Sequence, residues 1–203
     1  MSSQIIILAH DMWRKGAGGA PAGLVGQTDS FHGTARHLRW SKKMTGAYSN
    51  EEEERLDIIE EQLVEKKTPF FLMMKMYAEF LHDCIHEKRF NQITDSKGLN
   101  VVAEYLKQAI AFLGSNNSDE LRKPGRLELW ALFRRFEDKQ PALASLSRCA
   151  VCCFYEEAGW DPDTSESVTP IPFYLFLLKR LDPDMGLEFL EYAGRYLLDS
   201  APG

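Results

Sequence analysis

The segment from Thr68 to Phe90 constrains the fold of this chain more than any other, because its first half is apolar on nearly all sides. That half begins with the letters TPFFLMMKMY, and a helix that is hydrophobic all round is usually buried among other helices. Thr68 followed by Pro69 is typical of a helix start, since a threonine hydroxyl can cap free backbone N–H groups and proline fits the first turn. The sequence therefore predicts a long central helix.

Amphipathic segments with helical spacing lie on both sides of this central helix, and Pro, Gly and polar residues separate them. The tripeptide Lys123-Pro124-Gly125 is expected to break the chain before one of them. This pattern predicts an all-α fold, a compact bundle of about seven helices with a short N-terminal strand or an extended arm. The further predicted helices cover residues 50–67, 99–113, 126–139, 141–159 and 172–181, with a last one after Asp182-Pro183.

The helix over residues 50–67 has a clear N-terminal signal. Ser49 with Glu52 offers a capping box, in which each side chain bonds the other residue's backbone N–H. The four glutamates from Glu51 to Glu54 suit the positive end of the helix dipole. The side chains expected to face the core are Leu56, Ile58, Ile59 and Leu63.

Charge is distributed unevenly along the chain. Residues 1–43 contain six basic and two acidic residues, whereas the remaining 160 residues contain 18 basic and 28 acidic ones. The sequence therefore predicts two parts: a basic, Gly-rich N-terminal arm over residues 1–48 with a short strand at Gln4–Ala9 and a helix, and an acidic α-helical bundle domain over residues 49–203.

The basic part of the arm is a candidate nucleic-acid-binding segment. A basic run with an interleaved aromatic side chain can follow phosphates and stack on a base. The same run can also dock on the acidic remainder of the protein or on an acidic partner. The candidate residues are Arg36, Arg39, Trp40, Lys42 and Lys43.

A second candidate site lies on the central helix. Glu79, His82 and His86 are spaced 3 and 4, so they line one side of the helix, and this spacing occurs in metal sites of helical bundles. Such a site needs further ligands, and the sequence has no second Glu-x-x-His. A solvated polar stripe is the alternative interpretation.

The four cysteines do not form the pattern of a disulfide framework. Cys149-x-x-Cys152 can be a redox pair or half a zinc site, but Leu146, Cys149 and Cys153 also fit a buried helical stripe.

The sequence has no signal-peptide pattern and no apolar run long enough for a membrane span. We therefore expect a cytoplasmic protein with reduced thiols and no membrane contact.

The sequence contains no phosphate-binding loop, nucleophile–base motif or complete metal-ligand set. We therefore expect a non-enzymatic helical interaction, adaptor or regulatory protein, which needs no cofactor and acts through a protein partner or self-association. The first alternative is a nucleic-acid-associated protein that uses Arg36–Lys43. The second is a metal-dependent enzyme with a site around Glu79, His82 and His86.

Overall fold

The computed structural model of the chain describes residues 48–114, 118–155 and 169–199. Within these ranges the chain forms seven α-helices and one short 3-10 helix, without a β-strand, which confirms the predicted all-α fold. The predicted strand at Gln4–Ala9 lies outside the described residues. The helices are α3 (Asn50–Glu65), α4 (Phe70–His86), α5 (Ser96–Phe112), α6 (Ser118–Phe136), α7 (Pro141–Val151), the 3-10 helix η1 (Cys152–Phe154), α8 (Ile171–Leu178) and α9 (Met185–Asp199).

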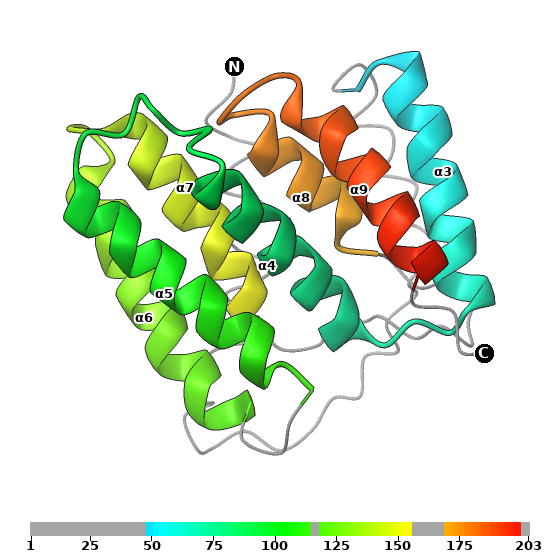
Figure 1. The fold of residues 1–203 in the computed structure, drawn as a ribbon, viewed down its shortest axis with the longest axis horizontal. Coiled ribbons are helices and arrows are strands. Elements are labelled where there is room, and N and C mark those ends of the chain that lie inside the picture. The colour runs from blue at the N-terminus through cyan, green and yellow to red at the C-terminus, as the bar shows by residue number, and fades with distance from the viewer. Residues whose placement is uncertain (1–47, 115–117, 156–168, 200–203) are drawn as a thin grey trace, which may run out of the picture.

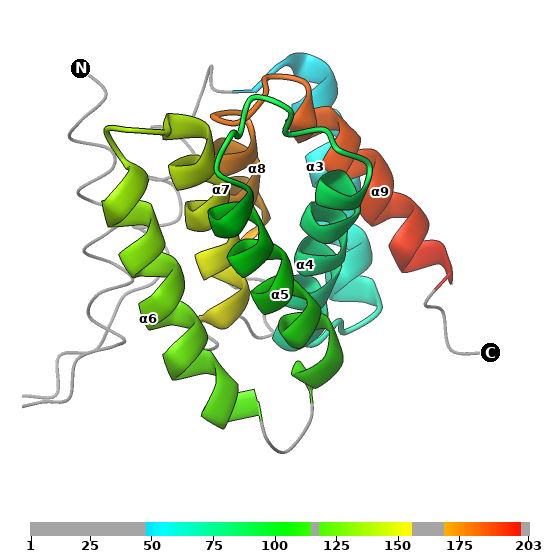
Figure 2. The same ribbon diagram turned by 60° about the vertical axis from the view of Figure 1, so that its left-hand side comes forward.

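Helix α4 lies at the centre of the bundle, as predicted (Figure 1). Helix α5 packs on one side of it, with α6 and α7 beyond, and α9 packs on the other side and also contacts α3. Helix α6 therefore lies at one edge of the molecule with α7 on its inner side (Figure 2), and α3 lies at the opposite edge (Figure 1). Residues far apart in the sequence close the bundle, because the Lys66 ammonium donates to the Leu197 carbonyl across 131 positions.

An aromatic cluster holds α4 against the C-terminal helices. The rings of Tyr77 on α4 and Tyr174 on α8 are stacked with their centroids 4.0 Å apart. Phe189 on α9 meets Tyr77 edge-on at 5.4 Å and also contacts Phe80 at 5.3 Å. Such pairs add to the stability that area burial already provides. The centre of the core is thus made jointly by α4, α8 and α9.

The capping box predicted for α3 is present. The Ser49 hydroxyl accepts from the Glu52 N–H, and the Glu52 carboxylate accepts from the Ser49 N–H at 2.7 Å. Leu56, Ile59 and Leu63 are buried, but the prediction that Ile58 faces the core is wrong, because its side chain is 48% exposed. Ile58 lies on the outer side of α3, beyond the stripe that meets the bundle.

Helix α4 begins one residue later than a Thr68 cap would place it, because Pro69 is its N-cap residue. It ends at His86, where Lys88 adopts a positive φ of 59° and the chain turns away. The start differs by an amount usual at helix ends, whereas the end lies four residues before Phe90, where the predicted segment stops. The long buried central helix is otherwise as predicted.

The predicted break at Lys123-Pro124-Gly125 is wrong, because α6 runs without interruption through Pro124. Packing explains why the helix continues. A β-carbon at Gly125 would lie 2.5 Å from the Phe154 ring, so the glycine lets this ring pack directly on the α6 backbone. In the same region, α7 ends at Val151 rather than at Gly159, and η1 follows it.

No helix among the described residues combines the length and the hydropathy that a membrane span requires.

Candidate functional site

The polar stripe on α4 lies on the outer side of the bundle, as expected for a helix with one solvated face. His82 is partly exposed and His86 is exposed. Their ring centroids are 6.4 Å apart with the planes nearly perpendicular, and Nδ1 of His82 is 3.8 Å from Oδ1 of Asp83. The two histidines are therefore neighbours on one helix face.

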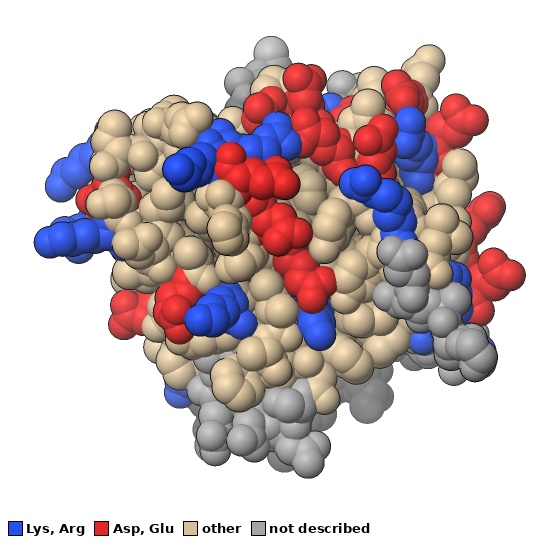
Figure 3. Space-filling model, in the orientation of Figure 1, with Lys and Arg blue, Asp and Glu red and all other residues tan. Residues whose placement is uncertain are grey.

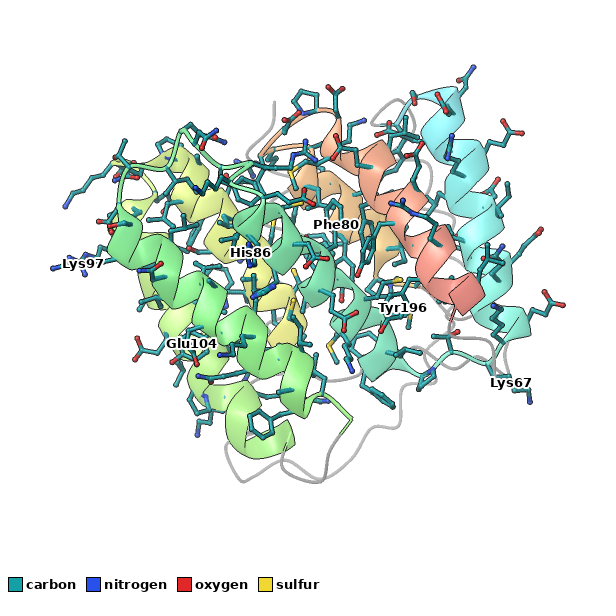
Figure 4. All side chains as sticks on the ribbon, viewed as in Figure 1. Lys67, Phe80, His86, Lys97, Glu104 and Tyr196 are labelled. Atoms are coloured by element: carbon teal, nitrogen blue, oxygen red, sulfur yellow. The ribbon has the colours of Figure 1, made fainter. Side chains whose placement is uncertain are left out.

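The Glu79 carboxylate interacts with α9 instead. It lies near the Tyr196 hydroxyl and influences its ionisation. Burial raises the pKa of Tyr196 to about 12, and the Glu79 charge contributes to this rise. In Figure 4 Tyr196 and Phe80 lie between α4 and α9, and His86 lies apart from both. Glu79 and Tyr196 are thus neighbours from two helices, which the sequence spacing on α4 alone does not indicate.

The described residues contain no group of three or more His, Cys, Asp or Glu side chains placed to hold a metal ion. The structure therefore supplies no further ligand for Glu79, His82 and His86 from the described ranges. The metal site stays a prediction that depends on residues outside them.

The predicted nucleic-acid-binding residues Arg36, Arg39, Trp40, Lys42 and Lys43 also lie outside the described residues, so their role stays a prediction.

The cysteines have the burial expected of core residues. Cys84 is 3% exposed, and Cys149, Cys152 and Cys153 are at most 2% exposed; all four are free thiols. Burial raises the pKa of the Cys84 and Cys149 thiols to about 12 and that of the other two even further. A reactive thiol needs the opposite shift. The buried-stripe interpretation of Cys149 and Cys153 is therefore confirmed.

A shallow groove of about 430 Å³ lies between α3 and α9. Its floor is apolar, because Ile59 and Leu190 are 3% and 2% exposed. Its walls carry two large apolar side chains that are open to solvent, Ile58 at 48% and Leu198 at 66%. We call this surface the α3–α9 groove. It is lined by Arg55, Ile58, Ile59, Gln62, Leu190, Glu191, Gly194, Arg195 and Leu198.

Gly194 keeps the groove open. A β-carbon there would have one ordinary contact, at 3.6 Å from Cδ1 of Ile59, so a methyl group would occupy groove space. At one end Arg55 bonds Glu51 at 3.0 Å and Glu191 at 3.3 Å and thereby joins the two helices. Further along, Oε1 of Gln62 is buried and has no donor among the described residues. Buried polar atoms are usually hydrogen-bonded, so this oxygen is a ready acceptor.

The α3 side of the groove is acidic. Glu54, Glu61 and Glu65 follow the same outer line of the helix as Ile58, with spacings of 4, 3 and 4. Figure 3 shows acidic side chains along the edge of the molecule where α3 lies and in a line over α4. On the α9 side Arg195 is exposed and provides one positive charge.

Sequence patterns did not reveal this groove, because its two walls come from the first and the last described helix in the sequence. One signal was present: Ile58 lies among Glu54, Glu61 and Glu65 on the helical wheel, which favours an exposed position.

Comparisons with known protein families, with curated proteins and with solved structures found no match for the chain.

Proposed function

We propose that the protein is a non-enzymatic interaction protein whose α3–α9 groove binds a basic amphipathic helix of a partner protein. The observation that carries this proposal is the pair of exposed apolar walls, Ile58 and Leu198, above an apolar floor. Amphipathic helices bind in hydrophobic grooves of this kind through anchors spaced three and four residues apart.

The apolar part of the groove would provide affinity. Ile58 and Leu198 together leave much of two large side chains in water, and covering a side chain of this type contributes roughly 1–2 kcal/mol. At one end of the groove Arg55 and Glu191 pair with each other, and both side chains are partly exposed. This end is therefore polar and solvated. An apolar centre with a polar rim is the usual arrangement of an interaction surface.

The polar groups around the groove favour a basic occupant. Lysine or arginine side chains on the partner helix would lie opposite Glu54, Glu61 and Glu65, none of which forms an ion pair within the described ranges. A donor on the same helix would satisfy Oε1 of Gln62. Complementary charge of this type gives specificity and faster association.

Two matched peptides test the proposal. One is an amphipathic helix of about four turns made of leucine, alanine and lysine, and the other has glutamate at every lysine position. We expect the lysine peptide to bind the full chain and to shift the amide resonances of α3 and α9 in an NMR titration. We expect the glutamate peptide to cause no such shifts.

The variant Ile58→Ser/Leu198→Ser should weaken binding of the lysine peptide by at least about tenfold, because it removes both apolar walls and leaves every charge in place. Leu127→Ser on α6, where the leucine is 60% exposed, is the matched control and should bind normally. Equal binding by both variants would contradict the proposal. Tighter binding of a peptide with residues 28–47 of this chain would identify the N-terminal arm as the occupant of the groove. Dimerisation of the protein that is lost in the double variant would identify a second copy as the occupant.

A further inference from the structure

A basic surface lies at the edge of the molecule opposite the α3–α9 groove. Helices α6 and α7 together contain six basic and three acidic residues, whereas α3 contains one basic and eight acidic ones. Helices α6 and α7 carry this excess and lie side by side (Figure 2). The charge of the described fold is therefore polarised from one edge to the other.

The basic side chains follow a regular line on α6. Arg122, Arg126, Trp130 and Arg134 occur at every fourth residue, so consecutive members are about 6 Å apart along the helix axis. Each step of four residues turns the line by about 40° around the helix, and its members range from partly buried Arg122 to exposed Arg134. Together with Arg148 of α7 these residues form what we call the arginine face.

Arg148 is held in a fixed position on this face. Its guanidinium carbon lies 4.1 Å from the centroid of the Trp130 ring and 5.9 Å from that of Phe133. Trp130 in turn meets Phe133 edge-on at 5.4 Å and hydrogen-bonds the Tyr155 hydroxyl. Arg148 is only partly buried. The arrangement presents a planar cation on an immobilised aromatic ring.

The arginines of this face have no carboxylate partners among the described residues. Elsewhere in the fold Arg55, Arg89 and Lys179 all pair with glutamates. Moreover, Nε of Arg122 is buried and has no acceptor within the described ranges. Within the described ranges these guanidinium groups are therefore available to pair with an external anion.

We propose that the arginine face binds single-stranded nucleic acid. Guanidinium groups bind phosphate through paired N–H donors, and a line of them can follow a backbone. Unpaired bases stack on aromatic rings and on arginine planes, which the Arg148–Trp130 pair provides. Because a base in a duplex cannot stack in this way, single strands are favoured. This site is separate from the groove and does not depend on its occupant.

The test measures fluorescence anisotropy of labelled single-stranded DNA and RNA oligonucleotides with the full chain at several salt concentrations. We expect binding at low salt that weakens as salt rises. In the variant Arg126→Gln/Arg134→Gln, two lost phosphate contacts should lower affinity at least about tenfold and reduce the slope of log affinity against log salt by about 1.4. Arg148→Lys keeps the charge but loses the planar group, so it should weaken binding with little change of slope.

Three controls make the test decisive. Lys97→Gln/Arg180→Gln removes two exposed charges elsewhere and should bind within about twofold of the unchanged protein, since general charge alone has a small effect. A variant with glutamine at Arg36, Arg39, Lys42 and Lys43 tests the arm. No binding, equal loss in the Lys97/Arg180 control, or loss confined to the arm variant would overturn the proposal. Stronger binding of duplex DNA or of polyglutamate would also overturn it, in favour of a duplex or an acidic protein.

Discussion

At the scale of single residues, Glu52 differs most from what its surroundings in the sequence indicate. It is one of four consecutive glutamates, yet it is 4% exposed. Its carboxylate accepts from the Ser49 N–H and, at 2.6 Å, from the Lys179 ammonium. Burial alone would raise the pKa of Glu52, but these hydrogen bonds hold it below its usual value of 4.5. One glutamate of the run therefore joins α3 to the end of α8.

The variant Glu52→Gln should lower the free energy of unfolding at pH 7 by about 2 kcal/mol, because it removes a charged acceptor from two hydrogen bonds. A carboxylate with a lowered pKa stabilises the fold above its unfolded-state pKa, and this contribution is lost as the pH falls through the folded value. The difference from the unchanged protein should therefore shrink between pH 5 and pH 3, roughly around the usual pKa. Urea unfolding at several pH values measures it.

Glu53→Gln is the control for this prediction. Glu53 is exposed, so its replacement should change stability by less than about 0.5 kcal/mol at any of these pH values. If both variants lose the same stability, the Lys179 contact is not the cause.

At the scale of elements, two glycines inside helices show how packing can outweigh helix propensity. Alanine is favoured over glycine within a helix by about 1 kcal/mol. At Gly125 a β-carbon would lie 2.5 Å from Cε1 of Phe154, a buried ring that cannot move away easily. At Gly194 the nearest atom, Cδ1 of Ile59, would be 3.6 Å away.

We therefore expect the same substitution to have opposite effects at the two positions. Gly194→Ala should stabilise the protein by roughly 0.5–1 kcal/mol through helix propensity. Gly125→Ala should destabilise it by roughly 1–2 kcal/mol, because overpacking exceeds the propensity gain. Thermal unfolding of both variants checks the signs, and Phe154→Leu in the Gly125→Ala background should recover part of the loss. A stabilising Gly125→Ala would refute the packing explanation for the continuous α6.

The helices themselves could be predicted where local chemistry decides. The Ser49–Glu52 capping box and the apolar stripe of α4 are short-range patterns, and both were recognised. The continuation of α6 through Pro124 could not be predicted, because it depends on packing against Phe154, which belongs to another element. The groove could not be predicted for the same reason, because Ile58 and Leu198 come together only when α3 and α9 pack. Glu79 was placed correctly on its helix, but its neighbour Tyr196 is on α9.

At the scale of the whole molecule, the bundle is chemically polarised. Its α3 edge is acidic beside an apolar groove, and its α6–α7 edge is basic beside an aromatic pair. Between the two edges the core is closed around α4, and it contains all four cysteines. The two proposed binding surfaces can therefore be occupied at the same time.

The buried thiols should report the stability of the entire core. In native conditions at pH 8, we expect none of Cys84, Cys149, Cys152 and Cys153 to react with a thiol reagent such as dithionitrobenzoate within minutes, because burial keeps them protonated and inaccessible. All four should react at once in guanidinium chloride. Rapid native reaction of Cys149 with Cys152, giving a disulfide, would instead support a redox pair.

The pairing of α3 with α9 has a consequence for the order in which the protein is made. Among the helices that the structure describes, α3 emerges first from the ribosome and α9 emerges last, and these two pack against each other. Until Phe189 and Leu197 have been synthesised, the apolar sides of α3 and α4 lack a cover, and such surfaces bind chaperones or aggregate. Chains that terminate before α9 should consequently be recognised by quality control.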